Sequence, residues 1–303
     1  MKMSEEHPIF SVSQYTTFPL TFEQDVGLYR ALGVEGIEVC EEKLSADPAR
    51  AREQLAMVAA SGLRVTSVQP RIHSPFPHLW TAESDPKDPA GRMERFRRTI
   101  DLFSECFPGK DIRMVAGGGI APNYDFCSAH RIAREFFREI SDYAADRGVR
   151  IGFEHLSPVL MNAFTFICAF DEAMRLVEEV DRPNFGLCLD VWHIWREAGI
   201  EERLARARDR VFAVHLADWP AHEPRGFMDR LLPGQGIIPL PALLGAIERT
   251  GYRGAYCLEV FSDRSLPDSL WNADLAQVLR QGRDGFGRAW EARGLAGKEG
   301  HGR

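Results

Sequence analysis

The segment Val-Arg-Ile-Gly-Phe-Glu at residues 149–154 is a short apolar run that ends in a carboxylate, and the pattern returns three times further along the chain. The later segments are Phe-Gly-Leu-Cys-Leu-Asp at 185–190, Val-Phe-Ala-Val-His at 211–215 and Ala-Tyr-Cys-Leu-Glu at 255–259. Each run has the length and composition of a buried β-strand. A side chain of a type that binds metal ions stands at the carboxyl end of each one: Glu154, Asp190, His215 and Glu259.

Outside these segments, strand-length apolar runs alternate with amphipathic helical patterns, which is typical of a parallel sheet built from strand–helix units. The expected strands are 9–15, 36–40, 64–70, 111–116, 149–154, 185–190, 211–215 and 255–259. The expected helices are 22–32, 48–61, 90–106, 129–147, 171–180, 201–208, 241–250 and 269–292. Eight units without a break in composition predict an α/β fold, a single (β/α)8 TIM barrel. We expect residues 1–293 to form this catalytic barrel and residues 294–303 to form a flexible C-terminal tail.

The main alternative is an open, doubly wound sheet, which predicts a glycine-rich turn after the first strand. The segment 14–19 at that point contains no glycine. The run Gly117-Gly118-Gly119 follows the fourth predicted strand instead. It forms either a tight turn or a place where a substrate approaches the backbone.

The composition is that of a soluble globular protein, with 45% hydrophobic and 27% charged residues among 303. The net charge is −7 and no long basic run occurs, so we expect no nucleic-acid partner. No segment approaches the roughly 20 apolar residues of a membrane helix, so we expect no membrane partner. Residues 1–8 lack the apolar stretch of a signal peptide.

Six cysteines are scattered along the chain without a Cys-x-x-Cys pair. Three of them, Cys40, Cys188 and Cys257, fall in predicted strands or at their ends. This pattern favours free, buried thiols in a reducing compartment, and it predicts a cytoplasmic location.

The four strand-end side chains carry the chemistry. The carboxyl ends of barrel strands face the active site, so the four would converge at one mouth of the barrel. A lone glutamate after a strand is usually a helix cap or an ion-pair partner, but four consecutive units are hard to explain in that way. Three carboxylates placed together repel one another unless a cation holds them. The pattern therefore predicts a site for one divalent cation.

Several motifs resemble those of the xylose isomerase-like TIM-barrel superfamily, also called the sugar phosphate isomerase/epimerase family. They are Phe-Glu-His at 153–155, Leu-Asp-Val-Trp-His at 189–193, Val-His-Leu-Ala-Asp at 214–218, Leu-Pro-Gly-Gln-Gly-Ile-Ile-Pro-Leu at 232–240 and Leu-Glu-Val-Phe at 258–261. The resemblance covers most of the chain and is most specific in its second half.

The resemblance implies a sugar isomerase or epimerase that depends on one divalent cation, commonly Mn²⁺, with Mg²⁺, Co²⁺ and Zn²⁺ as alternatives. It implies that Glu154, Asp190, His215 and Glu259 hold the cation. It also implies that Glu154 and Glu259 form the acid/base pair, one removing the proton α to a carbonyl and the other returning one through a metal-stabilised enediolate. The small-molecule partner would be a keto sugar or a related polyol ketone.

Further residues are candidates for substrate contacts. The resemblance places His193, three residues after Asp190, on substrate oxygens. Gln69 and His73 at the end of the third strand are candidates for contacts with hydroxyl groups. The long irregular segment 219–236 is expected to be a lid, and its candidates are Trp219, Arg225 and Arg230.

Three other functions compete. A metal-dependent dehydratase (lyase) of the inosose or 3-dehydroshikimate type begins with the same proton abstraction and then expels a β-hydroxyl group. An endonuclease IV-type repair enzyme needs further zinc ligands, and the positions for them read Gly117-Gly118-Gly119 and Asp229-Arg230-Leu231. A non-catalytic sugar-binding barrel is disfavoured because both candidate acid/base residues are intact. A homo-oligomeric state is left open.

Overall fold

The computed structural model describes residues 8–223 and 225–294. Eight parallel strands close into a barrel in sequence order, which confirms the single (β/α)8 fold. Their bounds are β1 (Phe10–Ser13), β2 (Gly36–Cys40), β3 (Arg64–Gln69), β4 (Ile112–Ala116), β5 (Val149–Phe153), β6 (Phe185–Asp190), β7 (Val211–Leu216) and β8 (Tyr256–Leu258). Apart from Gly294, the tail expected at 294–303 lies outside the described residues.

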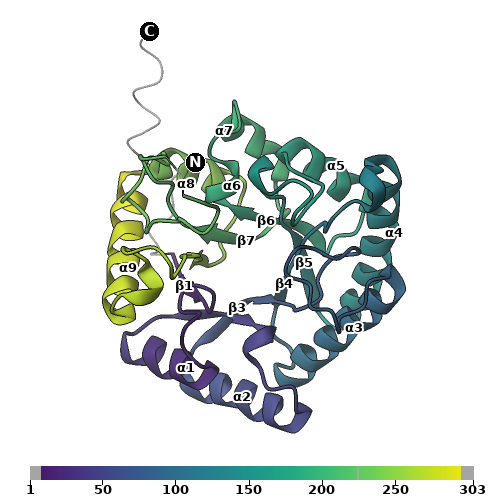
Figure 1. The fold of residues 1–303 in the computed structure, drawn as a ribbon, viewed down its shortest axis with the longest axis horizontal. Helices are drawn as coiled ribbons and strands as arrows, with labels where there is room; N and C mark the ends of the chain where they lie inside the picture. Colours follow the sequence, from purple (N-terminus) through teal and green to yellow (C-terminus); the bar gives the residue numbers. More distant parts are fainter. Residues whose placement is uncertain (1–7, 224, 295–303) are drawn as a thin grey trace.

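The helices form a ring around the strands (Figure 1). Their bounds are α1 (Phe22–Ala31), α2 (Pro48–Ser61), α3 (Pro89–Cys106), α4 (Phe126–Ala145), α5 (Phe170–Val180), α6 (Val191–Ile194), α7 (Ile200–Arg203), α8 (Leu240–Arg249) and α9 (Leu275–Ala292). No helix in the described ranges is long and apolar enough to cross a membrane.

Aromatic packing joins the helical ring to the barrel. Phe137 on α4 is fully buried, and its ring lies 5.4 Å from that of Phe153 and 5.0 Å from that of Phe185. Side-chain caps fix where helices begin, as at α2, where Asp47 accepts a hydrogen bond from the Arg50 amide. Gly148 ends the turn after α4 with φ of +67°, a left-handed conformation that suits glycine.

The region after β6 differs from the prediction. The helix expected at 201–208 is split into α7 and a 3-10 turn at Leu204–Ala207. The short helix α6 follows β6 directly, and its four residues are too few to show a periodic pattern. The side chain of Asp190 caps α6 by accepting a hydrogen bond from the Trp192 amide at 2.8 Å. A predicted site residue thus also begins a helix.

The strand register brings the four strand ends to one level. Asp190 pairs with His215 between β6 and β7. The Glu154 amide donates to Ala116 O at 2.8 Å, and the Glu259 amide donates to Leu216 O at 3.0 Å. Both glutamates therefore extend the ladder by one residue, at the same end of the barrel as Asp190 and His215.

The segment between β7 and α8 is held in a fixed shape by Asp218. Its carboxylate accepts hydrogen bonds from the amides of Trp219, Gly234, Gly236 and Ile238. A side chain at position 236 would come within 2.1 Å of Trp219 O, so the close approach requires glycine. The base of the segment that we expected to be a lid is thus anchored to the barrel.

Candidate active site

Four potential ligands converge at the carboxyl ends of β5 to β8. One ligand atom each from Glu154, Asp190, His215 and Glu259 lies within 4.8 Å of the others. His215 Nδ1 is 3.5 Å from Glu154 Oε1 and 3.5 Å from Glu259 Oε2. All four residues are buried. The structure thus brings together the four residues that the sequence pattern grouped.

The protonation of this cluster reflects crowding of like charges in a buried place. Burial raises the pKa of Glu259 to about 8, and the charge of Glu154 adds to the rise. Burial also raises the pKa of Glu154. For Asp190, burial acts to raise the pKa, but the charges of Arg230 and His215 hold it below its usual value. A cluster that resists ionisation in this way fits a divalent cation, and oxygen and imidazole donors suit Mn²⁺, Zn²⁺ or Co²⁺.

His215 is drawn toward its charged form. Burial alone would lower its pKa, but Cys188 and the carboxylates of Glu259 and Glu38 raise it well above the ordinary value. Burial also raises the pKa of the Cys188 thiol, which is therefore neutral at pH 7. The rise in the pKa of His215 therefore comes from the two carboxylates.

His193 is brought beside the four ligands by α6. Its Nδ1 accepts a hydrogen bond from the Ser157 amide at 3.0 Å, so a neutral ring carries its proton on Nε2. That Nε2 lies 3.4 Å from Asp190 Oδ2. Burial lowers the pKa of His193 to about 3, so the ring is uncharged at neutral pH. His193 therefore presents a neutral N–H donor to the site.

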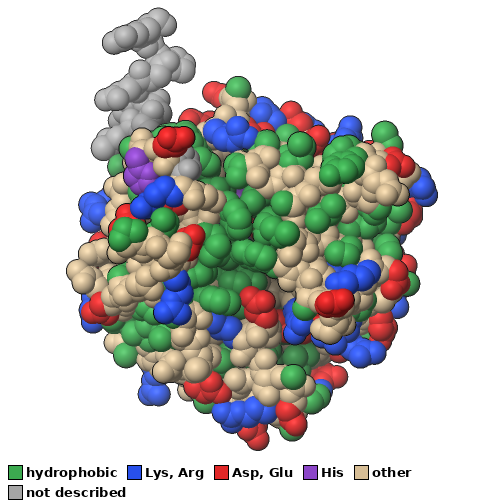
Figure 2. Space-filling model, in the orientation of Figure 1, with side chains coloured by type: hydrophobic (Ala, Val, Ile, Leu, Met, Phe, Trp, Pro, Cys, Tyr) green, Lys and Arg blue, Asp and Glu red, His purple; other side chains and the backbone are tan. Residues whose placement is uncertain are grey.

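A pocket opens above the four ligands. It is lined by Tyr15, Gln69, His73, His78, Trp80, Ala116, Gly117, Glu154, Leu156, Leu160, Phe164, His193, Phe227, Arg230, Glu259 and Phe261. Glu154 and Glu259 line this pocket, whereas Asp190 and His215 lie behind its surface. In the space-filling view, hydrophobic side chains gather around the centre of the face shown (Figure 2).

Gln69 and His73 lie where β3 and its loop reach the pocket. Gln69 Nε2 donates to Glu259 Oε1 at 3.2 Å. His73 Nδ1 lies 2.8 Å from Pro70 O, and the His73 side chain lines the pocket. Burial lowers the pKa of His73 to about 4 and that of His78 to about 3, so both rings are neutral at pH 7.

The three candidates from the segment 219–236 lie in different places. Arg230 lines the pocket, 2.9 Å from Asp190 Oδ2, with its guanidinium between the rings of Trp192 and Phe261. Arg225 is turned outward and pairs with Asp229 and Asp268. Trp219 packs against Trp192 and Trp195. The structure thus brings only Arg230 of these three to the pocket.

An aromatic wall borders the pocket around Trp80. The ring of Trp80 lies 4.7 Å from that of Phe164, 5.7 Å from that of Phe227 and 5.9 Å from that of Phe261. These rings come from the loops after β3, β5, β7 and β8. Phe164 and Phe227 could not have been found from their spacing, because these rings reach the pocket through loop conformation.

The three glycines after β4 form a turn that reaches the pocket. Gly117 lines the pocket. Gly119 has φ of +74°, and a side chain there would come within 2.2 Å of Phe76 O. The run is therefore a tight turn whose first residue borders the candidate site.

The chain belongs to the xylose isomerase-like TIM barrel family, whose model matches residues 26–282. Among curated proteins, it is 29% identical to a 3-dehydroshikimate dehydratase of Pseudomonas aeruginosa over 266 residues, which cover 85% of this chain and 38% of that protein. It is 32% identical to an inosose isomerase of Bacillus subtilis over 126 residues, covering 41% of this chain and 44% of that protein. The matched regions thus span less than half of either relative.

Solved structures share the fold. A protein from Sinorhizobium meliloti superposes with a TM-score of 0.77 at 24% identity, covering 93% of this chain and 98% of that one. The IOLI protein, which was solved with a bound zinc atom, superposes with a TM-score of 0.71 at 20% identity, covering 92% and 97%. The curated relatives with sequence similarity include a dehydratase and an isomerase.

Proposed function

We propose that this protein is a divalent-cation-dependent isomerase or epimerase that removes a proton α to the carbonyl of an uncharged keto sugar or polyol ketone. One observation carries the proposal. The four potential ligands form one cluster, and of these only Glu154 and Glu259 line the pocket. The two residues assigned as acid and base are therefore the two that a substrate would touch.

The cluster would hold one cation, with Mn²⁺ as the first to test and Zn²⁺, Co²⁺ and Mg²⁺ as alternatives. When bound, the cation supplies Lewis-acid polarisation of a carbonyl oxygen, which is worth several kcal/mol to a developing negative charge. The bound zinc atom of the IOLI structure supports a metal site in this fold.

The chain's own residues would perform the proton transfers. One of the two glutamates takes the α-proton as the C–H bond breaks. The electron pair of that bond moves toward the carbonyl oxygen. The other glutamate returns a proton to carbon, on the opposite face for an epimerisation. Gln69 and Arg230 hold Glu259 in place, at 3.2 and 3.5 Å. His193 would donate a hydrogen bond from its Nε2–H group to a substrate oxygen and keep its proton.

The charge of the pocket supports an uncharged substrate. Among the described residues that line it, Arg230 is the one Lys or Arg, and Asp190 and Glu259 already contact its guanidinium. His73 and His78 are neutral at pH 7, so they offer hydrogen bonds without charge. A phosphate group would find no unpaired cation here. The rings of Trp80 and Phe164 suit the C–H face of a sugar or cyclitol instead.

A dehydratase is the second candidate, and the length of the match to the 3-dehydroshikimate dehydratase favours it. The match covers 85% of this chain, whereas the match to the inosose isomerase covers 41%. The first proton abstraction is the same. The two reactions diverge when the β-hydroxyl group leaves, which requires a proton donor beside that group.

Proton exchange in D₂O tests the proposal. The Mn²⁺-loaded protein is incubated with ketoses, inososes and 3-dehydroshikimate, together with the phosphorylated form of each ketose, and followed by NMR. Deuterium at an α-carbon with a new stereoisomer or a shifted carbonyl supports the isomerase or epimerase. Loss of water to give an enone supports the dehydratase. Absence of exchange in every compound would refute both, and preferred exchange in a ketose phosphate would refute the uncharged substrate.

A further inference from the structure

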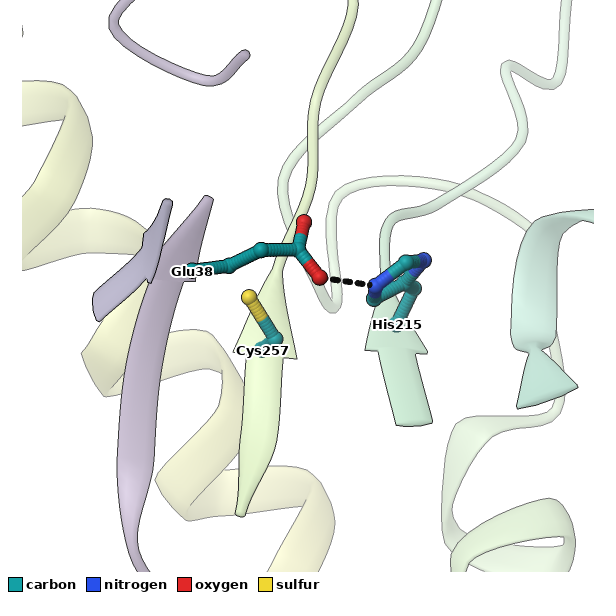
Figure 3. A group of neighbouring side chains, drawn as sticks. All are labelled: Glu38, His215 and Cys257. Carbon is teal, nitrogen blue, oxygen red and sulfur yellow. Dashed lines mark hydrogen bonds and ion pairs between the residues drawn. The ribbon is translucent and has the colours of Figure 1, made fainter. Parts of the chain in front are cut away.

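His215 is contacted on both nitrogens of its ring, by two different groups of carboxylates. Its Nδ1 faces Glu154 and Glu259, as described above. Its Nε2 lies on the other side, 2.8 Å from Glu38 Oε2 (Figure 3). The side chains of His215 and Glu38 are fully buried. Glu38 comes from β2, across the barrel from β7, so this contact passes through the barrel interior.

The environment of Glu38 makes it an acceptor toward His215. Ser67 Oγ donates to Glu38 Oε2 at 2.6 Å, and Gln69 Nε2 lies 3.4 Å from Glu38 Oε1. The β2–β3 register shifts between Ile37 and Glu38, so that Ser67 becomes the partner of Glu38. Glu38 does not line the pocket.

We propose that Glu38 is a positioning residue. Its carboxylate accepts a hydrogen bond from the Nε2–H group of His215, which keeps the proton on Nε2 and leaves Nδ1 free to bind the cation. The inference rests on the cation site of the proposed function. A neutral imidazole carries one proton, and an ionised carboxylate only accepts, so the proton belongs on the nitrogen that faces Glu38. The nitrogen that faces Glu154 and Glu259 then keeps its lone pair. The hydrogen bond also fixes the rotation of the ring.

A second possible cation site that shares His215 makes a competing prediction. Glu38, His215 and Cys257 each offer a ligand atom within 4.8 Å of the others (Figure 3). If this group held a second cation, His215 would bridge two ions and neither ring nitrogen would carry a proton. The proposal instead predicts one cation per chain and a proton on Nε2.

The test measures cation affinity and needs no turnover. Wild-type protein and the Glu38→Gln variant are stripped with a chelator and titrated with Mn²⁺ by calorimetry. We expect one cation per chain in the wild type and an affinity about 10–100-fold lower in the variant, the usual cost of losing such a partner. The matched control is Glu248→Gln, because Glu248 is also buried and pairs with Arg293 far from the pocket. It should leave Mn²⁺ affinity unchanged.

A second measurement reports the tautomer directly. In zinc-loaded wild-type protein with ¹⁵N-labelled histidine, long-range ¹H–¹⁵N spectra should show the His215 proton on Nε2. The wild-type spectrum needs no variant, so the proposal stays testable if Glu38→Gln fails to fold.

The outcomes separate this inference from the proposed function. A wild-type protein that binds no divalent cation removes the cation site and with it the proposed function. A wild type that binds one cation, with equal affinity in Glu38→Gln, overturns only the role of Glu38. The role of Glu38 is also overturned by two cations per chain, or by an Nδ1 proton in the zinc-loaded wild type.

Discussion

The two halves of the barrel bring different kinds of side chain to the same pocket. Strands β5 to β8 and their loops supply the clustered ligands, together with Arg230 and His193. Strands β1 to β4 and their loops supply neutral groups, among them Gln69, His73, His78 and Trp80. Under the proposed function, the second half would carry the bond breaking and the first half the recognition of substrate. Substitutions in the two halves should therefore change different kinetic constants.

The largest effect is expected for the acid/base pair in the second half. Glu154→Gln or Glu259→Gln should lower the rate of α-proton exchange by about 10²–10⁴-fold, because the amide cannot take up a proton. Exchange is measured in D₂O at saturating substrate and saturating Mn²⁺, with bound cation determined in the same samples. Glu248→Gln serves as the control. Wild-type exchange in a cation-loaded variant would remove that residue from the acid/base role.

Cation removal should weaken the folded state more at high pH than at low pH. The pKa of Glu259 is raised to about 8 in the folded chain from an ordinary value of 4.5. The stability that comes from its bound proton is complete below pH 4.5 and is lost as the pH rises through 8. Denaturant unfolding of the chelated protein at pH 5, 6.5 and 8 should show this fall.

Addition of the cation should reverse that loss. At a hundred times its dissociation constant, the cation should add about 2.7 kcal/mol to the free energy of unfolding. At a fixed cation concentration, the gain should grow from pH 5 to pH 8, because the ligands must be deprotonated and the affinity rises. A pH-independent gain would contradict the coupling between Glu259 and the cation.

A smaller effect is expected in the neutral half. Trp80→Ala should raise KM about tenfold, equivalent to about 1.4 kcal/mol, while kcat changes little, because the ring contacts bound substrate without taking part in proton transfer. Leu79→Ala on the same loop is the matched control, since Leu79 is exposed and does not line the pocket. A fall in kcat with unchanged KM would break the division between the halves.

The smallest effect is expected for Arg225→Ala. Its ion pairs with Asp229 and Asp268 lie outside the pocket, so KM should change less than about twofold and stability by no more than about 1 kcal/mol. Steady-state kinetics and thermal unfolding measure both. A large rise in KM would show that Arg225 contacts substrate, as the sequence suggested.

The strands and the ligand cluster could be predicted because both depend on local patterns. Buried parallel strands are short apolar runs, and a barrel points their carboxyl ends to one mouth. The pattern therefore grouped Glu154 with Glu259 across a long separation in sequence. Their roles in acid/base chemistry remain predictions.

The loops could not be predicted, because their shapes depend on contacts from distant parts of the chain. Asp218 fixes the path that sends Arg230 inward, whereas Arg225 turns to Asp268. From the sequence, both arginines were equally good candidates for a substrate contact. In the same way, nothing local marks Glu38 as the partner of His215, which is 177 positions away.

The cluster draws one donor from the end of each of four successive strands, so a bound cation would affect how long the chain stays folded. A cation held there would join β5, β6, β7 and β8 as a cross-link does, because the unfolded chain has no such preformed cluster. Its binding energy would then oppose the opening of that half of the barrel. The supply of cation in the surroundings would set how long each folded molecule lasts, as well as how fast it works.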